Sequence, residues 1–300
     1  LFGPTAPVSR FARAYAQEEM GRYYLERGDY EKARASFEQA LAIDPSDVKA
    51  VGPLAHLHTM AGNREKAAYY YGEAARLRPD MAGTHQKLAL ALIDLGRTRE
   101  AVDAYRECLR LDPDQPGAWQ DLGNLLYGLL DYGGARSAYA EALSRKSGDP
   151  DLGFNVGLAS EALGDSEKAL AAYRNVLHEA PDHAPTLFGI ATLLLRLGRA
   201  EESLRYYNEL LVRKPGARDP SINLAIASAQ LGRFGDAGAA LEKIATFDEK
   251  TVAAYMDVAK IAASRGKISE AIFLLTACRM RDAPLADRLG VSEMMIRLSR

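Results

Sequence analysis

The stretch GRYYLERGDYEKARASFEQALAIDPSD at residues 21–47 contains a pattern that recurs along the chain of 300 residues. Its Gly28 returns at intervals of 34 residues or twice 34, as Gly62, Gly96, Gly164, Gly198, Gly232 and Gly266. A fixed period of this length indicates a stacked array of one small supersecondary unit. The core of such an array is a strip between neighbouring units. The stretch therefore predicts a repeat protein and not a single globular domain.

Each 34-residue unit contains two amphipathic stretches of helical period. In the third unit, Leu88, Ala89 and Leu92 share one face, which is typical of a helix packed on a partner. The twentieth position of each unit is small, as expected where two helices cross closely: Ala33, Ala67, Ala101, Ala135, Ala169, Ser203, Ala237 and Ala271. An aromatic residue follows four positions later in the first six units: Phe37, Tyr71, Tyr105, Tyr139, Tyr173 and Tyr207. The pattern predicts an all-α chain of helix pairs.

The turn residues agree with this register. The recurring glycine stands where the first helix of a unit ends, because glycine adopts the left-handed conformation that terminates helices. A residue followed by proline, as in Asp44-Pro45 and Asp112-Pro113, ends the second helix, since the residue before proline is excluded from the helical region. Asp47 is placed to cap the next helix.

These residues resemble the signature of the tetratricopeptide-repeat (TPR) family. The fourth unit carries Trp119, Leu122, Gly123, Tyr139 and Ala142, although Leu126 stands where the family has tyrosine. The first unit carries the matching set Gly21, Tyr24, Gly28, Tyr30, Ala33, Phe37, Ala40 and Pro45. The resemblance implies a right-handed superhelical solenoid of helix-turn-helix repeats and covers about nine tenths of the chain.

Eight units fit the sequence without insertion. We expect a flexible lead-in at 1–13 and a C-terminal capping helix at 286–300, with Leu289, Met294, Met295, Ile296 and Leu298 covering the last unit. The predicted units are 14–47, 48–81, 82–115, 116–149, 150–183, 184–217, 218–251 and 252–285.

Two units depart from the pattern. The fourth has Leu130 in the glycine position and Ser147 in the proline position, so its boundary with the fifth is expected to contain a bend or an irregular turn. The seventh has Gly235 and Gly238 inside its second helix and Glu249 in the proline position. Each interior glycine costs about 1 kcal/mol relative to alanine, so this unit is expected to be the least stable.

Composition excludes several classes of protein. The net charge of −2 shows no nucleic-acid footprint, and no apolar run approaches the length of a membrane helix. Cys108 and Cys278 lie five periods apart, too far for a disulfide. The start at Leu1 is consistent with a fragment or a mature form, and the compartment stays open between bacterial cytoplasm and periplasm.

No catalytic motif is found: the sequence has no glycine-rich phosphate loop, no GxSxG and no CxxC. His56 and His58 are two residues apart on a helix and point to different faces. His178 and His183 flank the Pro181 turn and are expected to make contacts between repeats. We therefore expect no enzyme activity, no metal and no cofactor.

The family resemblance implies that the first helices line a concave face, chiefly through fixed positions such as the fifth and ninth of each unit. The fifth residues run Glu18, Gly52, Gln86, Gln120, Phe154, Phe188, Ile222 and Met256. The ninth run Arg22, His56, Leu90, Asn124, Leu158, Thr192, Ile226 and Lys260. The first half is polar and the second is apolar. Contiguous exposed apolar surface usually marks a binding site.

The predicted peptide-binding residues are Asn124, Phe154, Asn155, Leu158, Phe188, Thr192, Ile222, Asn223, Ile226 and Met256. Asn155 and Asn223 offer both donor and acceptor to a peptide backbone, which is similar to the asparagine-lined groove of peptide O-linked sugar transferases. A clamp for acidic chaperone tails is rejected, because Gln120, Pro185 and Gly189 replace its basic residues.

The leading hypothesis is a scaffold that binds an extended or helical partner segment in this groove. Three alternatives stay open. The apolar residues can be structural filler, the chain can be the recognition region of a larger enzyme such as a glycosyltransferase, or copies of the chain can self-associate through a terminal segment.

Overall fold

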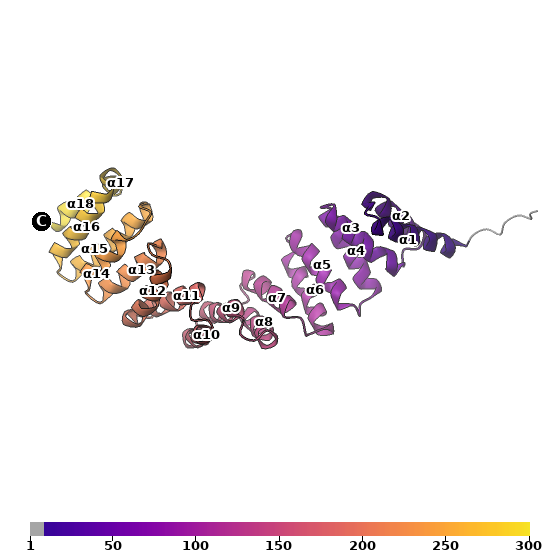
Figure 1. Cartoon of the computed structure of the whole chain (residues 1–300), viewed down its shortest axis with the longest axis horizontal. Coiled ribbons are helices and arrows are strands. Elements are labelled where there is room, and N and C mark those ends of the chain that lie inside the picture. The colour runs from indigo at the N-terminus through magenta and orange to yellow at the C-terminus, as the bar shows by residue number, and fades with distance from the viewer. Residues whose placement is uncertain (1–8) are drawn as a thin grey trace, which may run out of the picture. The chain divides into compact units, whose positions relative to one another are not determined.

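The structure, a computed structural model, describes residues 9–300, so the predicted flexible stretch at 1–8 lies outside the described residues. Residue contacts divide the chain into two compact units, 1–147 and 148–300. Throughout 9–300 the regular elements are helices joined by short turns, with no strand (Figure 1). The predicted all-α array of consecutive helix pairs is confirmed.

The first unit contains four helix pairs. They are α1 (Arg10–Glu26), α2 (Tyr30–Ile43), α3 (Val48–Met60), α4 (Arg64–Leu77), α5 (Ala82–Asp94), α6 (Thr98–Leu111), α7 (Pro116–Gly128) and α8 (Tyr132–Arg145). α1 begins at Arg10, inside the segment 1–13 that we assigned to the lead-in. The reason is a local cap, because the Ser9 hydroxyl accepts a hydrogen bond from the N–H of Ala12 at 3.1 Å.

The second unit contains four further pairs and two short terminal helices. They are α9 (Pro150–Ala162), α10 (Ser166–Glu179), α11 (Ala184–Arg196), α12 (Ala200–Arg213), α13 (Arg218–Gln230), α14 (Phe234–Glu242), α15 (Glu249–Ser264), α16 (Ile268–Arg281), α17 (Ala283–Arg288) and α18 (Val291–Leu298). α15 begins at Glu249, the residue in the proline position, because the Asp248 carboxylate caps the N–H of Thr251 at 3.0 Å.

Each helix pair closes around the residue at the twenty-fourth position of the repeat. Tyr105, Tyr173 and Tyr207 are fully buried there, as is Phe37 in the first repeat. Burying a side chain of this size stabilises the fold by roughly 1.5–3 kcal/mol. The partner on the first helix is a small residue, since the two helices approach closely at this point.

Left-handed turns join the two helices of each pair. The recurring glycines adopt φ values of 70–79°. Leu130 occupies the same position with φ 65° and is the one non-glycine residue with positive φ in residues 9–300. The turn keeps its hydrogen bonds, with the N–H of Leu130 donating to Tyr127 O at 3.0 Å. The loss of glycine therefore strains this turn without opening it.

The division between the two units falls at the fourth-to-fifth repeat boundary, where Ser147 replaces proline. Gly148, next in the chain, has φ 78°. This is the boundary at which the sequence pattern predicted a bend or an irregular turn.

α14 is shorter than the other second helices, at 9 residues against 14 for α12 and α16. The Arg281 guanidinium covers its C-terminal end, donating to Leu241 O at 3.0 Å and to Ile244 O at 2.7 Å. The same group stands 4.7 Å from the centre of the Phe247 ring. Arg281 therefore adds hydrogen bonds to carbonyl groups at and just after the end of the short helix.

The C-terminal cap consists of two helices and not the single helix expected at 286–300. α17 begins at Ala283, inside the predicted eighth unit, and the left-handed Gly290 separates it from α18. Ala286 and Val291 are fully buried against the core formed by α13–α16. Leu289, Met294, Met295 and Leu298 pack there as predicted, whereas Ile296 is 55% exposed, so its assignment as a covering residue was wrong.

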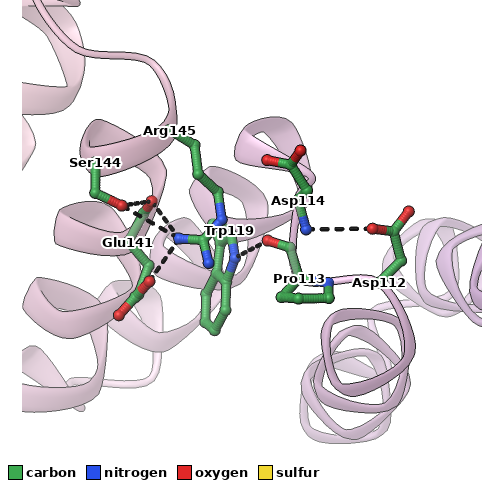
Figure 2. Close-up of polar contacts among 7 residues, drawn as sticks. All are labelled: Asp112, Pro113, Asp114, Trp119, Glu141, Ser144 and Arg145. Carbon is green, nitrogen blue, oxygen red and sulfur yellow. Dashed lines mark hydrogen bonds and ion pairs between the residues drawn. The ribbon is translucent and has the colours of Figure 1, made fainter.

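Trp119 on α7 contacts both the turn that precedes α7 and the C-terminal end of α8 (Figure 2). Its indole N–H donates to Pro113 O at 2.9 Å, and the Arg145 guanidinium carbon lies 5.5 Å from the ring centre. Arg145 in turn donates to Glu141 O at 2.8 Å. These contacts hold the turn before α7 and the end of α8 against one indole.

Candidate functional site

The structure places all ten predicted site residues on first helices of the repeats. Asn124 lies on α7 in the first unit, and the other nine lie on α9, α11, α13 and α15 in the second. The apolar members of that second set are Phe154, Leu158, Phe188, Ile222, Ile226 and Met256, which we call the apolar strip. Each of them is half-buried, so each retains an accessible part.

Phe154 shows how the apolar strip is built. Its ring stacks on Tyr173 at 5.6 Å between centroids and meets His183 edge-on at 6.2 Å. It also lies over Gly189 on α11, where an added Cβ would be 3.1 Å from its Cε2 atom. Phe188 contacts the corresponding tyrosine one repeat later in a different geometry, edge-on to Tyr207 at 6.2 Å. The two rings therefore pack into the repeat junctions and present only part of their surface.

Ile222, Ile226 and Met256 pack against the core of the C-terminal repeats. Packing thus accounts for part of each strip residue, as the structural-filler alternative expected. The accessible remainder belongs to apolar side chains at the fifth and ninth positions of four successive repeats. Exposed apolar side chains grouped on one surface are a feature of binding sites.

Buried tyrosine hydroxyls engage most of the predicted polar residues. Tyr139 donates to Asn124 Oδ1 at 2.9 Å, and burial raises the pKa of Tyr139 to about 12, so this donor stays protonated. The Tyr207 hydroxyl lies 3.0 Å from Thr192 Oγ1 and also bonds Asn223. Asn124, Thr192 and Asn223 therefore position the tyrosines, and fewer of their hydrogen-bonding groups are left for a partner.

Asn155 differs from them. It is half-buried on α9, and its side-chain amide has no hydrogen-bond partner among residues 9–300. An amide in this state offers one acceptor and two donor positions beside the apolar strip.

Sequence patterns did not reveal an ionic network beside Phe154. Glu161 accepts a hydrogen bond from the Tyr173 hydroxyl at 3.0 Å and from Arg196 on α11 at 2.7 Å. His183 bonds Asp151 at 3.1 Å and Thr186 at 2.7 Å. These bonds tie α9 to α11, and they are the contacts between repeats that we expected of His183.

Comparison with known proteins identifies the family. Sequence profiles described as tetratricopeptide repeat match residues 24–68, 82–125, 154–218 and 188–252. The chain belongs to the tetratricopeptide-repeat family. No curated protein sequence matches this TPR chain.

Solved structures share the TPR fold at low sequence identity. MamA is 21% identical with a TM-score of 0.50, and the match covers 57% of this chain and 94% of MamA. YrrB, described as a TPR protein with an unusual peptide-binding site, is 21% identical with a TM-score of 0.50, covering 59% and 91%. A chain in the structure of Naa15/Naa10 bound to HypK-THB is 16% identical with a TM-score of 0.62, covering 95% of this chain and 44% of that one. At these identities the likeness describes the fold.

The first unit of the TPR chain has a charged surface in place of an apolar strip. The sequence pattern predicted only that this surface is polar. A cavity of about 610 Å³ lies over its first three repeats. Charged side chains line it, among them Glu18, Arg22, Lys49 and Lys87. Its acidic members are Glu18 and Glu26, and Glu18 is only 3% exposed. Burial of this kind depends on where α3 packs against α1, which composition and spacing do not reveal.

Two further searches of residues 9–300 concern membranes and metals. No helix there is both long and apolar enough to cross a membrane. Nor do three or more His, Cys, Asp or Glu side chains come together in that range as a metal site would require.

Proposed function

We propose that this TPR chain is a scaffold that binds a partner segment along the apolar strip of residues 148–300. The observation that carries the proposal is the strip itself, in which equivalent positions of successive repeats present apolar side chains that packing only half covers. A partner that covered them would bury further apolar area at about 25 cal/mol per Å².

Asn155 supports an extended or helical peptide as the partner. Its unsatisfied amide lies one residue from Phe154, so it can pair with a peptide N–H and C=O while apolar side chains of the same segment meet the strip. Backbone pairing combined with apolar anchoring is a common way to hold a linear segment.

Proteins of the same fold are consistent with this use. YrrB is described with a peptide-binding site, and the Naa15/Naa10 structure is of a complex bound to HypK-THB. We further propose that the chain has no catalytic activity of its own, since its sequence contains none of the nucleophile or phosphate-loop motifs sought.

Photocrosslinking tests the surface directly. With p-benzoylphenylalanine at position 158, on the strip, a partner from native lysate should be captured; at position 171, exposed on α10, it should not. Equal capture at the two positions would show that the strip is not the binding surface.

A quantitative test then uses the captured segment as a synthetic peptide. The double variant Asn155→Ala, Leu158→Gln should weaken its binding about tenfold or more, since it removes an anchor and its neighbouring polar contact. Leu204→Gln, the same type of change at a half-buried position on α12, is the matched control and should stay within about twofold. Equal binding by both variants would contradict the proposal.

A further inference from the structure

The cavity in the first unit contains a buried carboxylate oxygen that accepts no hydrogen bond. Glu18 Oε1 has no hydrogen-bond partner although the side chain is 3% exposed. Arg22 Nη1 is 3.8 Å from this oxygen and is hydrogen-bonded to Glu19 at 2.9 Å, and Lys49 also acts on the carboxylate electrostatically. An uncompensated buried charge is unfavourable, and a cation that reaches it from a ligand gains strongly. Burial, reinforced by Asp47, raises the pKa of Glu18.

Most of the other charged side chains of the cavity wall are basic, with Glu26 as the second acidic member. Lys49 and Lys87 line it and form no ion pair among the described residues. Arg78 also lines it but is hydrogen-bonded to Asp80 at 2.9 Å. Two free ammonium groups therefore flank one buried carboxylate. A ligand that matches this pattern is positive at its centre and negative beside it.

The floor of the cavity leaves room for an inserted side chain. Gly52 lines it from α3, and a Cβ there would meet no atom within 4 Å. The buried Oε1 atom accepts no hydrogen bond, and a lysine ammonium, a compact point charge on a flexible stem, can reach it by a single contact.

We propose that this cavity binds a partner segment containing a lysine flanked by aspartate or glutamate. The lysine ammonium inserts beside Gly52 to pair with Glu18, and the flanking carboxylates meet Lys49 and Lys87. The site lies within 1–147 and does not depend on the apolar strip.

Fluorescence anisotropy of the full chain tests the proposal with two labelled peptides. One has a central lysine between aspartates, and the other has acetyllysine in its place, which removes the charge and keeps the length. The lysine peptide should bind at least about tenfold more tightly, the size expected for one charge-assisted hydrogen bond. Failure of the lysine peptide to bind at millimolar concentration, or equal binding of both peptides, would overturn the proposal.

Variants locate the contact. Glu18→Gln should remove the preference for lysine, whereas the matched variant Glu65→Gln, at an exposed position on α4 outside the cavity lining, should keep it within about twofold. Gly52→Leu fills the cavity without changing any charge, and it should abolish binding while helicity by circular dichroism is retained. Equal lysine preference in Glu18→Gln and Glu65→Gln would assign the binding to other residues.

The strip variant Asn155→Ala, Leu158→Gln should bind the lysine peptide as the unmodified chain does. Loss of lysine-peptide binding in this variant would contradict the independence of the two sites. If only the experiments on Glu18 and the lysine peptide fail, the proposed scaffold function is unaffected.

Discussion

Gly157 on α9 contacts Tyr173 on α10 so closely that an added Cβ would lie 2.3 Å from the Cε1 atom of the ring. The same relationship recurs in other repeats, where Gly123 faces Tyr139 at 2.6 Å and Gly21 faces Phe37 at 2.7 Å. The buried aromatic ring thus limits how large a residue the first helix can carry at this point.

Gly157→Ala is expected to destabilise the second unit. Alanine is the better helix former by about 1 kcal/mol, but overpacking against a buried ring costs roughly 1–3 kcal/mol. Urea denaturation of this variant should show a lower free energy of unfolding. Gly72→Ala is the matched control, because Gly72 is inside α4 and a Cβ there meets nothing within 4 Å. The control should gain stability, and a similar gain in both variants would contradict the close contact.

Leu130→Gly should stabilise the first unit. Leu130 holds a left-handed conformation that is unfavourable for a residue with a Cβ by roughly 1–2 kcal/mol, and it is 70% exposed, so little packing is lost. The greater freedom of glycine in the unfolded chain offsets part of this gain. We expect a net rise of about 0.5–1 kcal/mol in the free energy of unfolding. The reverse change, Gly164→Leu, should lower it, and a loss of stability in Leu130→Gly would show that the turn is not strained.

His58 should make the stability of the chain depend on pH. Its ring is 1% exposed, stacks on Tyr70 at 5.4 Å, and has an Nε2 atom without a hydrogen bond. Burial lowers the pKa of His58; Lys66 and Arg34 act in the same direction, and Glu38 opposes them. The unfolded chain therefore takes up a proton near pH 6.5 that the folded chain resists.

The contribution of neutral His58 to the free energy of unfolding is therefore complete above about pH 6.5, and it is lost as the pH falls below that value. The stability difference between the unmodified chain and His58→Gln should shrink by about 1 kcal/mol from pH 7 to pH 5. Taking this difference cancels the contribution of Glu18, whose raised pKa acts in the opposite sense. Met60→Gln, at an exposed neighbouring position without a titratable group, should show a constant difference, and parallel curves for both variants would rule out His58 as the titrating group.

Arg281→Lys should destabilise the C-terminal repeats by about 1–3 kcal/mol. A lysine ammonium cannot reproduce the planar fork that reaches Leu241 O and Ile244 O together, nor the contact with the Phe247 ring. The matched control is Arg279→Lys, because Arg279 forms an ion pair with Asp287 at the surface. Thermal unfolding followed by circular dichroism should separate the two variants, and equal midpoints would mean that α14 does not depend on Arg281.

The repeat period was sufficient to predict the helix pairs, because the turn residues and the apolar faces share one register. Helix lengths that depend on contacts with residues far away in the sequence could not be predicted. α14 ends at Glu242, and its end is covered by Arg281, which is 39 residues further along. The break between α17 and α18 depends on Gly290, which the sequence analysis did not recognise as a turn.

The candidate site was predictable as a set of positions but not as a set of contacts. The fifth and ninth places of the repeat identified Phe154 and Leu158, yet the stacking of Phe154 on Tyr173 depends on tertiary packing. Glu18 appeared only as one polar residue among several in the first half. Its burial results from the packing around α1, which no pattern within its own repeat contains.

The contacts of Trp119 have a spectroscopic consequence. It is the only tryptophan in the chain, and it lies in the first of the two units. Indole fluorescence therefore reports on residues 1–147, whereas far-ultraviolet circular dichroism averages the helices of both units. Melting curves from the two signals will coincide if the units unfold as one cooperative block and will separate if they do not, so the natural chain already contains the probe that measures their coupling.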